Sequence, residues 1–232
     1  YTLVGEWHTA TVRAAYSFGK PLPQMVRDYF LPQSVYGDDA WTAAIEPPEP
    51  FTLGVRVKNT GSSTAHDLKI DSAQPEIVEN EQGLLIGFAI EGSRVNGEPA
   101  KDSLLVEFGD IEPNSAAVGR WLMTCTLSGE FTEFDATISH SDELGGELTS
   151  LIRQEDIHTH FLVKDVWVDL PGRDRIHDFL ARDAGALKVY ESGLTDSDVA
   201  DQSEDSHIEL LDRSGPRFTY AAATPEEPGF IY

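Results

Sequence analysis

The segment from Phe51 to Ile70 constrains the fold of this chain more than any other stretch. It reads FTLGVRVKNTGSSTAHDLKI, with apolar residues at every second position over Leu53–Val57 and again over Leu68–Ile70. Apolar residues with this period line one face of a β-strand. The intervening Asn59–Ser62 is of turn-forming composition. The segment therefore predicts two β-strands around a turn-rich connection.

Similar short apolar patterns recur through the middle of the chain, separated by Gly, Asn, Ser or Pro. Their spacing of roughly 8 to 12 residues is typical of an all-β sandwich. The strands predicted from these patterns lie at Pro75–Val78, Leu84–Glu91, Ser103–Phe108, Ala117–Leu127, Phe131–His140 and Leu148–Ile152. We expect an all-β fold, with an immunoglobulin-like antiparallel β-sandwich over residues 46–160.

The regions on either side of the expected sandwich differ from it in composition. Residues 1–45 combine a possible strand at Trp7–Tyr16 with three prolines and many aromatic residues, which predicts an irregular, aromatic-rich N-terminal arm. The proline-rich run Glu46–Pro50 marks the end of this arm. Residues 161–232 predict a small acidic β-rich C-terminal module or an extension of the sandwich. The elements expected there are strands at Leu162–Leu170, Leu187–Tyr190 and Phe218–Ala222 and a short helix at Arg175–Ala184.

The charge balance excludes one class of partner. The chain carries 40 Asp and Glu against 17 Lys and Arg, a formal charge of -23. Such a field repels polyanions, so we expect no binding to nucleic acid. The acidity has three explanations: solubility in a saline or crowded medium, binding of divalent cations, or compositional bias. The low lysine content of the chain also fits an extracellular or salt-rich setting.

Two further properties concern the chain as a whole. No apolar run approaches the roughly 20 residues that a membrane-spanning helix needs, so we expect no membrane span. Tyr1 does not begin a signal-peptide pattern, and the chain does not start with Met. We expect a processed product or a segment of a longer protein.

Cys125 is the lone cysteine, so the fold has no intramolecular disulfide. It lies in the hydrophobic run Arg120–Leu127, which predicts a buried structural thiol instead of a reactive one. Trp121 and Trp167 also lie in apolar strand patterns, and we expect both of them in the core.

Two patterns resemble metal sites. The first is a run of acidic residues in which we take Asp196, Asp198, Asp201 and Asp205 as candidate calcium ligands. The helix–loop–helix calcium pattern is absent, and a solvated acidic loop is the alternative. In the second pattern, a strand would place His158 and His160 on one face, where two imidazoles can begin a zinc or copper site. Exposed strand histidines are the alternative.

Aromatic residues of the N-terminal region suggest a contact surface. Trp7, Tyr36 and Trp41 are candidates for contact with a glycan or a protein partner, and burial against the sandwich is the alternative. We find no nucleophile elbow, zinc-protease motif or phosphate-binding loop. We therefore expect no enzymatic activity, no catalytic residues and no cofactor, with calcium as the one possible exception.

The run VRVKNTGSSTAHDLKI resembles the opening of the cell-adhesion-related (CARDB-like) and similar immunoglobulin-like modules of large prokaryotic surface proteins. Gly109–Ser115 resembles a later turn of the same modules, with Asn114 where they commonly have Gly. The resemblance covers residues 51–140. It implies a spacer or adhesive module within a longer extracellular chain.

These observations lead to one principal expectation and two alternatives. We expect an extracellular or cell-surface structural or adhesive module that binds a protein partner or assembles with itself. Strand exchange at a sandwich edge, using residues 1–45 or 191–232, would hold the assembly together. The alternatives are a carbohydrate-binding accessory module and a calcium-stiffened adhesin repeat.

Overall fold

The computed structural model describes residues 22–39, 42–72, 76–77, 87–133, 136–141, 147–149, 156–183 and 185–224. These residues form eighteen β-strands, one 3-10 helix and no α-helix. The strands from the first half of the chain are β1 (Met25–Leu31), β2 (Ser34–Val35), β3 (Phe51–Asn59), β4 (Ala65–Ser72), β5 (Glu76–Ile77), β6 (Phe88–Val95), β7 (Glu98–Ala100), β8 (Leu105–Ile111) and β9 (Ser115–Cys125). The second half contributes β10 (Gly129–Glu133), β11 (Ala136–Ser141), β12 (Glu147–Thr149), β13 (Ile157–Val166), β14 (Asp178–Asp183), β15 (Ala186–Tyr190), β16 (Asp196–Val199), the 3-10 helix η2 (Ser203–Asp205), β17 (His207–Ser214) and β18 (Arg217–Ala223).

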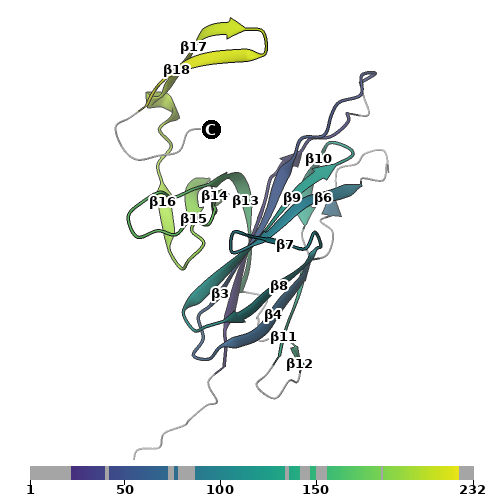
Figure 1. Cartoon of the computed structure of the whole chain (residues 1–232), viewed down its shortest axis with the longest axis vertical. Helices are drawn as coiled ribbons and strands as arrows, with labels where there is room; N and C mark the ends of the chain where they lie inside the picture. Colours follow the sequence, from purple (N-terminus) through teal and green to yellow (C-terminus); the bar gives the residue numbers. More distant parts are fainter. Residues whose placement is uncertain are drawn as a thin grey trace, which may run out of the picture.

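The fold is an all-β sandwich (Figure 1). Its larger layer is a nine-stranded sheet of order β16-β15-β14-β13-β1-β3-β9-β6-β7. The second layer is a four-stranded sheet of order β12-β11-β4-β8, and a small sheet joins β2, β10 and β5. All-β architecture is therefore confirmed. β1 and β13 pair in parallel, so the large sheet is mixed and not purely antiparallel as expected.

The main core lies between the two layers. In β3, Leu53, Val55 and Val57 are fully buried and pack in one cluster with Leu68 and Ile70 of β4. The period-2 pattern of the sequence thus correctly identified the core face of both strands. Within the described residues, no helix has the length and hydrophobicity needed to cross a lipid bilayer.

The predicted strands of the Phe51–Ile70 segment are confirmed, but they belong to different layers. β3 pairs with β1 and β9, whereas β4 pairs with β8 and β11. Asn59 organises the crossing between layers: its Nδ2 donates to the carbonyl oxygens of Ser63 at 2.8 Å and Ile111 at 2.9 Å. The connection is therefore a crossover between sheets and not a hairpin turn.

The Gly109–Ser115 turn also has a clear local cause. Asn114 adopts a positive φ of 55°, a conformation that favours glycine but that Asn tolerates better than most residues. Its backbone N–H donates to the Asn59 carbonyl at 2.8 Å. Asn at this position thus satisfies the same backbone requirement as Gly.

The large sheet has a second core on its outer face. The buried residues of this cluster are Phe30, Val118, Phe179, Ala181 and Tyr190. The Phe30 and Phe179 rings stack with centroids 4.3 Å apart. Phe179 of β14 covers Gly54 of β3, and a Cβ at Gly54 would overlap the Phe179 ring. β14, although it belongs to the same sheet, therefore packs against the outer face of β3.

Gly54→Ala should lower the free energy of unfolding by about 1–3 kcal/mol, because the added methyl group must displace the buried Phe179 ring. Urea denaturation of the two proteins measures this difference. Gly92→Ala is the matched control, since a Cβ at Gly92 meets no atom within 4 Å. An equal change in both variants would contradict the close packing of β14 on β3.

Several local expectations require correction. Met25–Leu31, inside the expected irregular arm, form the buried strand β1 between β3 and β13. The expected helix at Arg175–Ala184 is wrong, since β14 occupies Asp178–Asp183 and pairs with β13 and β15. The expected strand Phe131–His140 is two strands, β10 and β11, in different sheets.

The other predicted strands that fall on described residues overlap observed ones. The possible strand at Trp7–Tyr16 lies outside the described residues. The expected boundary at residue 160 falls within β13, and β14, β15 and β16 continue the nine-stranded sheet. Of the two alternatives for the C-terminal region, extension of the sandwich describes these strands.

Candidate functional site

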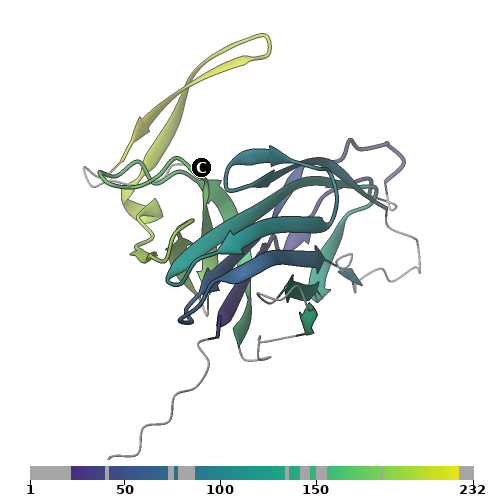
Figure 2. The same cartoon turned by 60° about the horizontal axis from the view of Figure 1, so that its bottom comes forward.

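The last two described strands form a β-hairpin that projects away from the sandwich (Figures 1 and 2). In the described part of the chain, β17 and β18 pair only with each other. Gly215 lies in the connecting turn with a φ of 59°. Every residue of both strands is exposed. We call His207–Ala223 the C-terminal hairpin.

One face of the C-terminal hairpin is apolar. The cross-strand pairs on this face are Ile208 with Ala222, Leu210 with Tyr220, and Arg213 with Phe218. Paired residues lie on the same side of a sheet, and alternate residues of a strand share a face. The opposite face carries Glu209, Asp212 and Thr219. We call the side of Ile208, Leu210, Phe218, Tyr220 and Ala222 the apolar face.

The apolar face is open to solvent. Ile208 and Tyr220 are each 57% exposed, Leu210 is 50% exposed and Phe218 is 45% exposed. The Phe218 and Tyr220 rings stack with centroids 6.5 Å apart, and the Arg213 guanidinium lies 4.9 Å from the Phe218 centroid. Contiguous exposed apolar surface of this kind often marks an interaction site.

The C-terminal hairpin is electrically balanced within a strongly acidic chain. Glu209 and Asp212 are matched by Arg213 and Arg217, whereas the whole chain carries a formal charge of -23. Another acidic protein can approach this neutral surface with less repulsion than the rest of the molecule would impose.

A second group of polar side chains is buried between the sandwich and the C-terminal strands. Arg56 is fully buried, and its Nε and Nη2 donate to Oδ2 of Asp28 at 3.1 and 2.7 Å. Its Nη1 donates to the Glu191 carbonyl at 3.0 Å and to Oδ1 of Asp196 at 2.5 Å. The guanidinium also lies 5.2 Å from the centroid of the Tyr190 ring. We call these residues the buried ionic cluster.

The buried ionic cluster holds Asp28 in its charged form. Burial favours the neutral acid, but the hydrogen bond with His160 and the charge of Arg56 outweigh it and hold the pKa of Asp28 far below its usual range. Lys58 adds a third ion-pair contact, with its Nζ 3.3 Å from Oδ2 of Asp28. In Tyr190, burial and the nearby charge of Asp183 raise the pKa. These pairings join β1 and β3 to the C-terminal strands.

His158 and His160 lie on one face of β13, as their spacing predicted. Nδ1 of His158 is 3.2 Å, and Nε2 of His160 is 3.4 Å, from the same oxygen of Asp28. The other His160 nitrogen lies 3.1 Å from the Tyr190 hydroxyl. His160 is buried, so it is not an exposed strand histidine. Among the described residues, no group of three or more His, Cys, Asp or Glu is placed to hold a metal ion.

The four candidate calcium ligands, Asp196, Asp198, Asp201 and Asp205, do not form one site. Asp196 pairs with Arg56, and Asp198 lies 3.7 Å from Nζ of Lys188. Asp201 accepts the backbone N–H of Ser203 at 2.9 Å, and hydrogen bonds from Ser203 lower its pKa. Asp205 lies in η2, where it is exposed. The four carboxylates thus have different neighbours in the structure.

The candidate aromatic contact residues are only partly described. Tyr36 is 57% exposed, and its carbonyl accepts the Glu49 N–H at 2.8 Å. Trp7 and Trp41 lie outside the described residues. The structure therefore places one of the three aromatic side chains at the surface.

Two of the three predicted core residues are confirmed. Trp121 is fully buried and donates its indole N–H to the Ser103 carbonyl at 2.7 Å. Cys125 is also buried, and burial raises the pKa of its thiol. The prediction for Trp167 is wrong: it is 49% exposed, and its ring lies 5.7 Å from the ring of His177.

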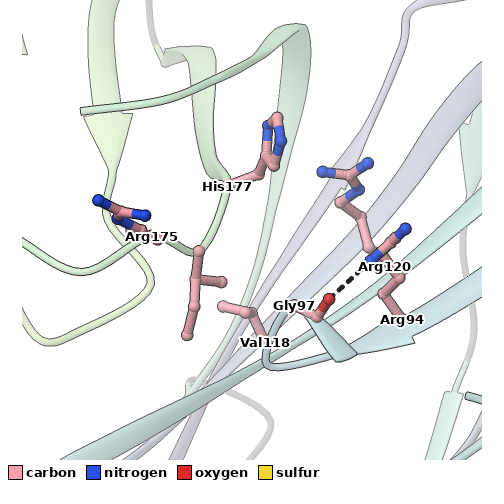
Figure 3. A pocket seen from close by; sticks show the side chains of 7 residues that line it. Arg94, Gly97, Val118, Arg120, Arg175 and His177 are labelled. Atoms are coloured by element: carbon pink, nitrogen blue, oxygen red, sulfur yellow. Dashed lines mark hydrogen bonds between the residues drawn. The ribbon is translucent and has the colours of Figure 1, made fainter. Parts of the chain in front are cut away.

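A pocket of about 310 Å³ lies between the large sheet and the β13–β14 connection (Figure 3). Its lining residues are Arg94, Gly97, Val118, Arg120, Arg175, Ile176 and His177. Figure 3 shows Arg175 on one side of the pocket and Arg94 and Arg120 on the other, with His177 between them. We call it the arginine pocket.

Neither the apolar face nor the arginine pocket was predicted. The hairpin had a sequence signal, since apolar residues alternate on both sides of Ser214–Pro216. A register shift between Leu210 and Asp212 interrupts that alternation in β17. The arginine pocket has no local signal, because its side chains come from segments far apart in sequence.

No protein-family model and no curated protein matches the sequence of this chain.

Proposed function

We propose that this protein is an extracellular or cell-surface structural module that assembles with further copies of itself through the C-terminal hairpin. The exposed apolar face of β17 and β18 is the observation that carries the proposal. The resemblance of residues 51–140 to adhesion-related immunoglobulin-like modules supports the structural or adhesive role.

The low stability expected of an isolated hairpin supports assembly. Two-stranded hairpins are at best marginally stable in water, and further strands or a packing partner stabilise them. In the C-terminal hairpin every residue of both strands is exposed. Covering the apolar face would bury Leu210 and Tyr220, and their transfer from water favours association.

The neutral C-terminal hairpin is the part of the chain where a second copy can make contact without direct charge repulsion. Two copies with a formal charge of -23 each repel one another over most of their surface. The balanced charge of the C-terminal hairpin lowers this repulsion at the contact. Two hairpins can then pack with their apolar faces together, or one can add to a sheet edge of the neighbour.

Leu210→Lys should weaken self-association at least about tenfold, because it places a charge at the centre of the apolar face. Sedimentation velocity over a range of protein concentrations measures the association. Thr219→Lys is the matched control: it adds the same charge on the opposite face, across from Asp212, and should leave association unchanged.

Two results would contradict this proposal. One is a wild-type protein that stays monomeric at high concentration, which would leave the apolar face to a different protein. The other is an equal effect of Leu210→Lys and Thr219→Lys, which would show that the added charge and not the apolar face controls association.

A further inference from the structure

The arginine pocket concentrates positive charge in an acidic protein. Arg94 of β6 and Arg120 of β9 are directly opposite each other in the antiparallel pairing of these strands. Like charges at such positions repel and destabilise a sheet. Arg175 approaches from the β13–β14 connection (Figure 3). Three of the few basic residues in the chain thus meet around one cavity.

Acidic side chains neutralise only part of this charge. Asp165 lies 3.4 Å from Nε of Arg120, and it also accepts the Thr52 hydroxyl at 2.9 Å. Arg94 donates Nη1 to the Gly97 carbonyl at 2.7 Å. In the described ranges, no acidic side chain forms an ion pair with Arg94 or Arg175. Among the described residues, the three arginines of the pocket thus form one ion pair, between Arg120 and Asp165, which leaves a net positive charge.

The positive charge of the pocket affects the pKa of His177. Burial lowers the pKa of His177, and the charges of Arg120 and Arg94 lower it further, whereas Asp165 acts in the opposite direction. The two arginines beside the imidazole thus disfavour a further positive charge. The same two arginines favour an anion in the cavity.

The size and chemistry of the pocket fit a small ligand. Its volume of about 310 Å³ is at the lower end of small-molecule sites. Guanidinium groups bind carboxylate and phosphate oxygens through paired hydrogen bonds. Val118 and Ile176 supply apolar wall for the remainder of such a ligand.

We propose that the arginine pocket binds the oxyanion group of a small ligand, a carboxylate, phosphate or sulfate, between Arg175 on one side and Arg94 and Arg120 on the other. This site is separate from the C-terminal hairpin, and binding here does not depend on self-association.

Isothermal titration calorimetry at low ionic strength tests this proposal with glucuronate, phosphate and sulfate, and with glucose as the neutral probe. We expect saturable binding of at least one of the three anions and none of glucose. Preference for glucuronate would identify an acidic sugar or another carboxylate as the source of the group. Preference for phosphate or sulfate would identify a phosphate ester or a sulfate ester as the source of the group.

Arg94→Met and Arg175→Met should each weaken anion binding at least about tenfold, since each removes a charge-assisted contact. Both arginines are at the surface, so these variants should fold. Arg182→Met, an exposed arginine outside the pocket, is the matched control and should bind as the wild type does. Three results would overturn the proposal: no anion binding, equal binding of glucose, or equal weakening by Arg182→Met.

Discussion

Arg56→Met should lower the free energy of unfolding by about 3–5 kcal/mol, because it leaves Asp28 charged and buried without its main partner. Methionine has a similar length and no charge, so the packing against Tyr190 is largely retained. The loss therefore reports the buried ionic cluster and not a large cavity. Urea denaturation at neutral pH measures it.

Lys69→Met provides the contrast with an exposed ion pair. Lys69 lies 2.9 Å from Glu107 at the surface, where solvent screens the interaction. This variant should unfold almost as the wild type does. An Arg56→Met variant that is as stable as Lys69→Met would contradict the role assigned to the buried ionic cluster.

The same cluster predicts a dependence of stability on pH. The pKa of Asp28 is held far below its usual range in the folded protein, whereas in the unfolded chain it returns to about 3.9. Ionised Asp28 therefore stabilises the fold fully above that value, and the contribution is lost as the pH falls below about 4. The difference in stability between wild type and Asp28→Asn should shrink over this range. A difference that stays constant from neutral pH down to pH of about 3 would contradict the pairing of Asp28.

Phe179→Ala should lower the free energy of unfolding by a similar amount, about 3–5 kcal/mol. Phe179 is fully buried, stacks on Phe30 and covers Gly54. Its removal opens a cavity between β14 and the outer face of β1 and β3. Phe161→Ala is the control, since Phe161 lies on the neighbouring strand β13 and is 46% exposed. Phe161→Ala should lower the free energy of unfolding much less.

The Phe179→Ala variant should still unfold in one step, because β14, β15 and β16 belong to the same sheet as β3. Nuclear magnetic resonance can follow this in urea through the Trp121 indole N–H, in the main core, and the backbone amides of β14. Both should disappear over the same range of urea concentration. Loss of the β14 signals while the Trp121 signal persists would show that the C-terminal strands are a separate folding unit.

Strands that face the main core were predictable because one face of each carries the apolar residues. β3 and β4 are examples, with Leu53 and Leu68 fully buried. Strands buried on both faces were harder to recognise. Phe179, Leu180 and Ala181 are consecutive and all buried, and the apolar spacing around them was mistaken for a helix. Pairing with β13 and β15 determines the strand.

β1 was missed for a related reason. It contains the charged residues Arg27 and Asp28, which are normally exposed, but both are buried here. The partner that makes burial of Asp28 possible is Arg56, which is distant in sequence and adjacent only in the folded sheet. Prolines and many aromatic residues predicted an irregular arm, and only the tertiary pairing corrects that prediction.

The exposure of Trp167 could have been predicted from the alternation of buried and exposed residues along the chain. Val166 and Val168 are buried in one cluster, so the residue between them points to the other side of the chain. The arginine pocket could not be predicted in this way, since it depends on which strands are neighbours in the sheet. Arg94 and Arg120 face each other only because β6 pairs with β9 in this register.

Hydrogen–deuterium exchange of the backbone amides of residues 207–223, measured over a range of protein concentrations, tests self-association through the C-terminal hairpin most directly. An isolated exposed hairpin opens readily, so its amides should exchange rapidly in the monomer. We predict that this exchange slows as the concentration rises, while exchange in the buried strand β3 stays the same. Rapid exchange of residues 207–223 at every concentration would contradict assembly through this hairpin.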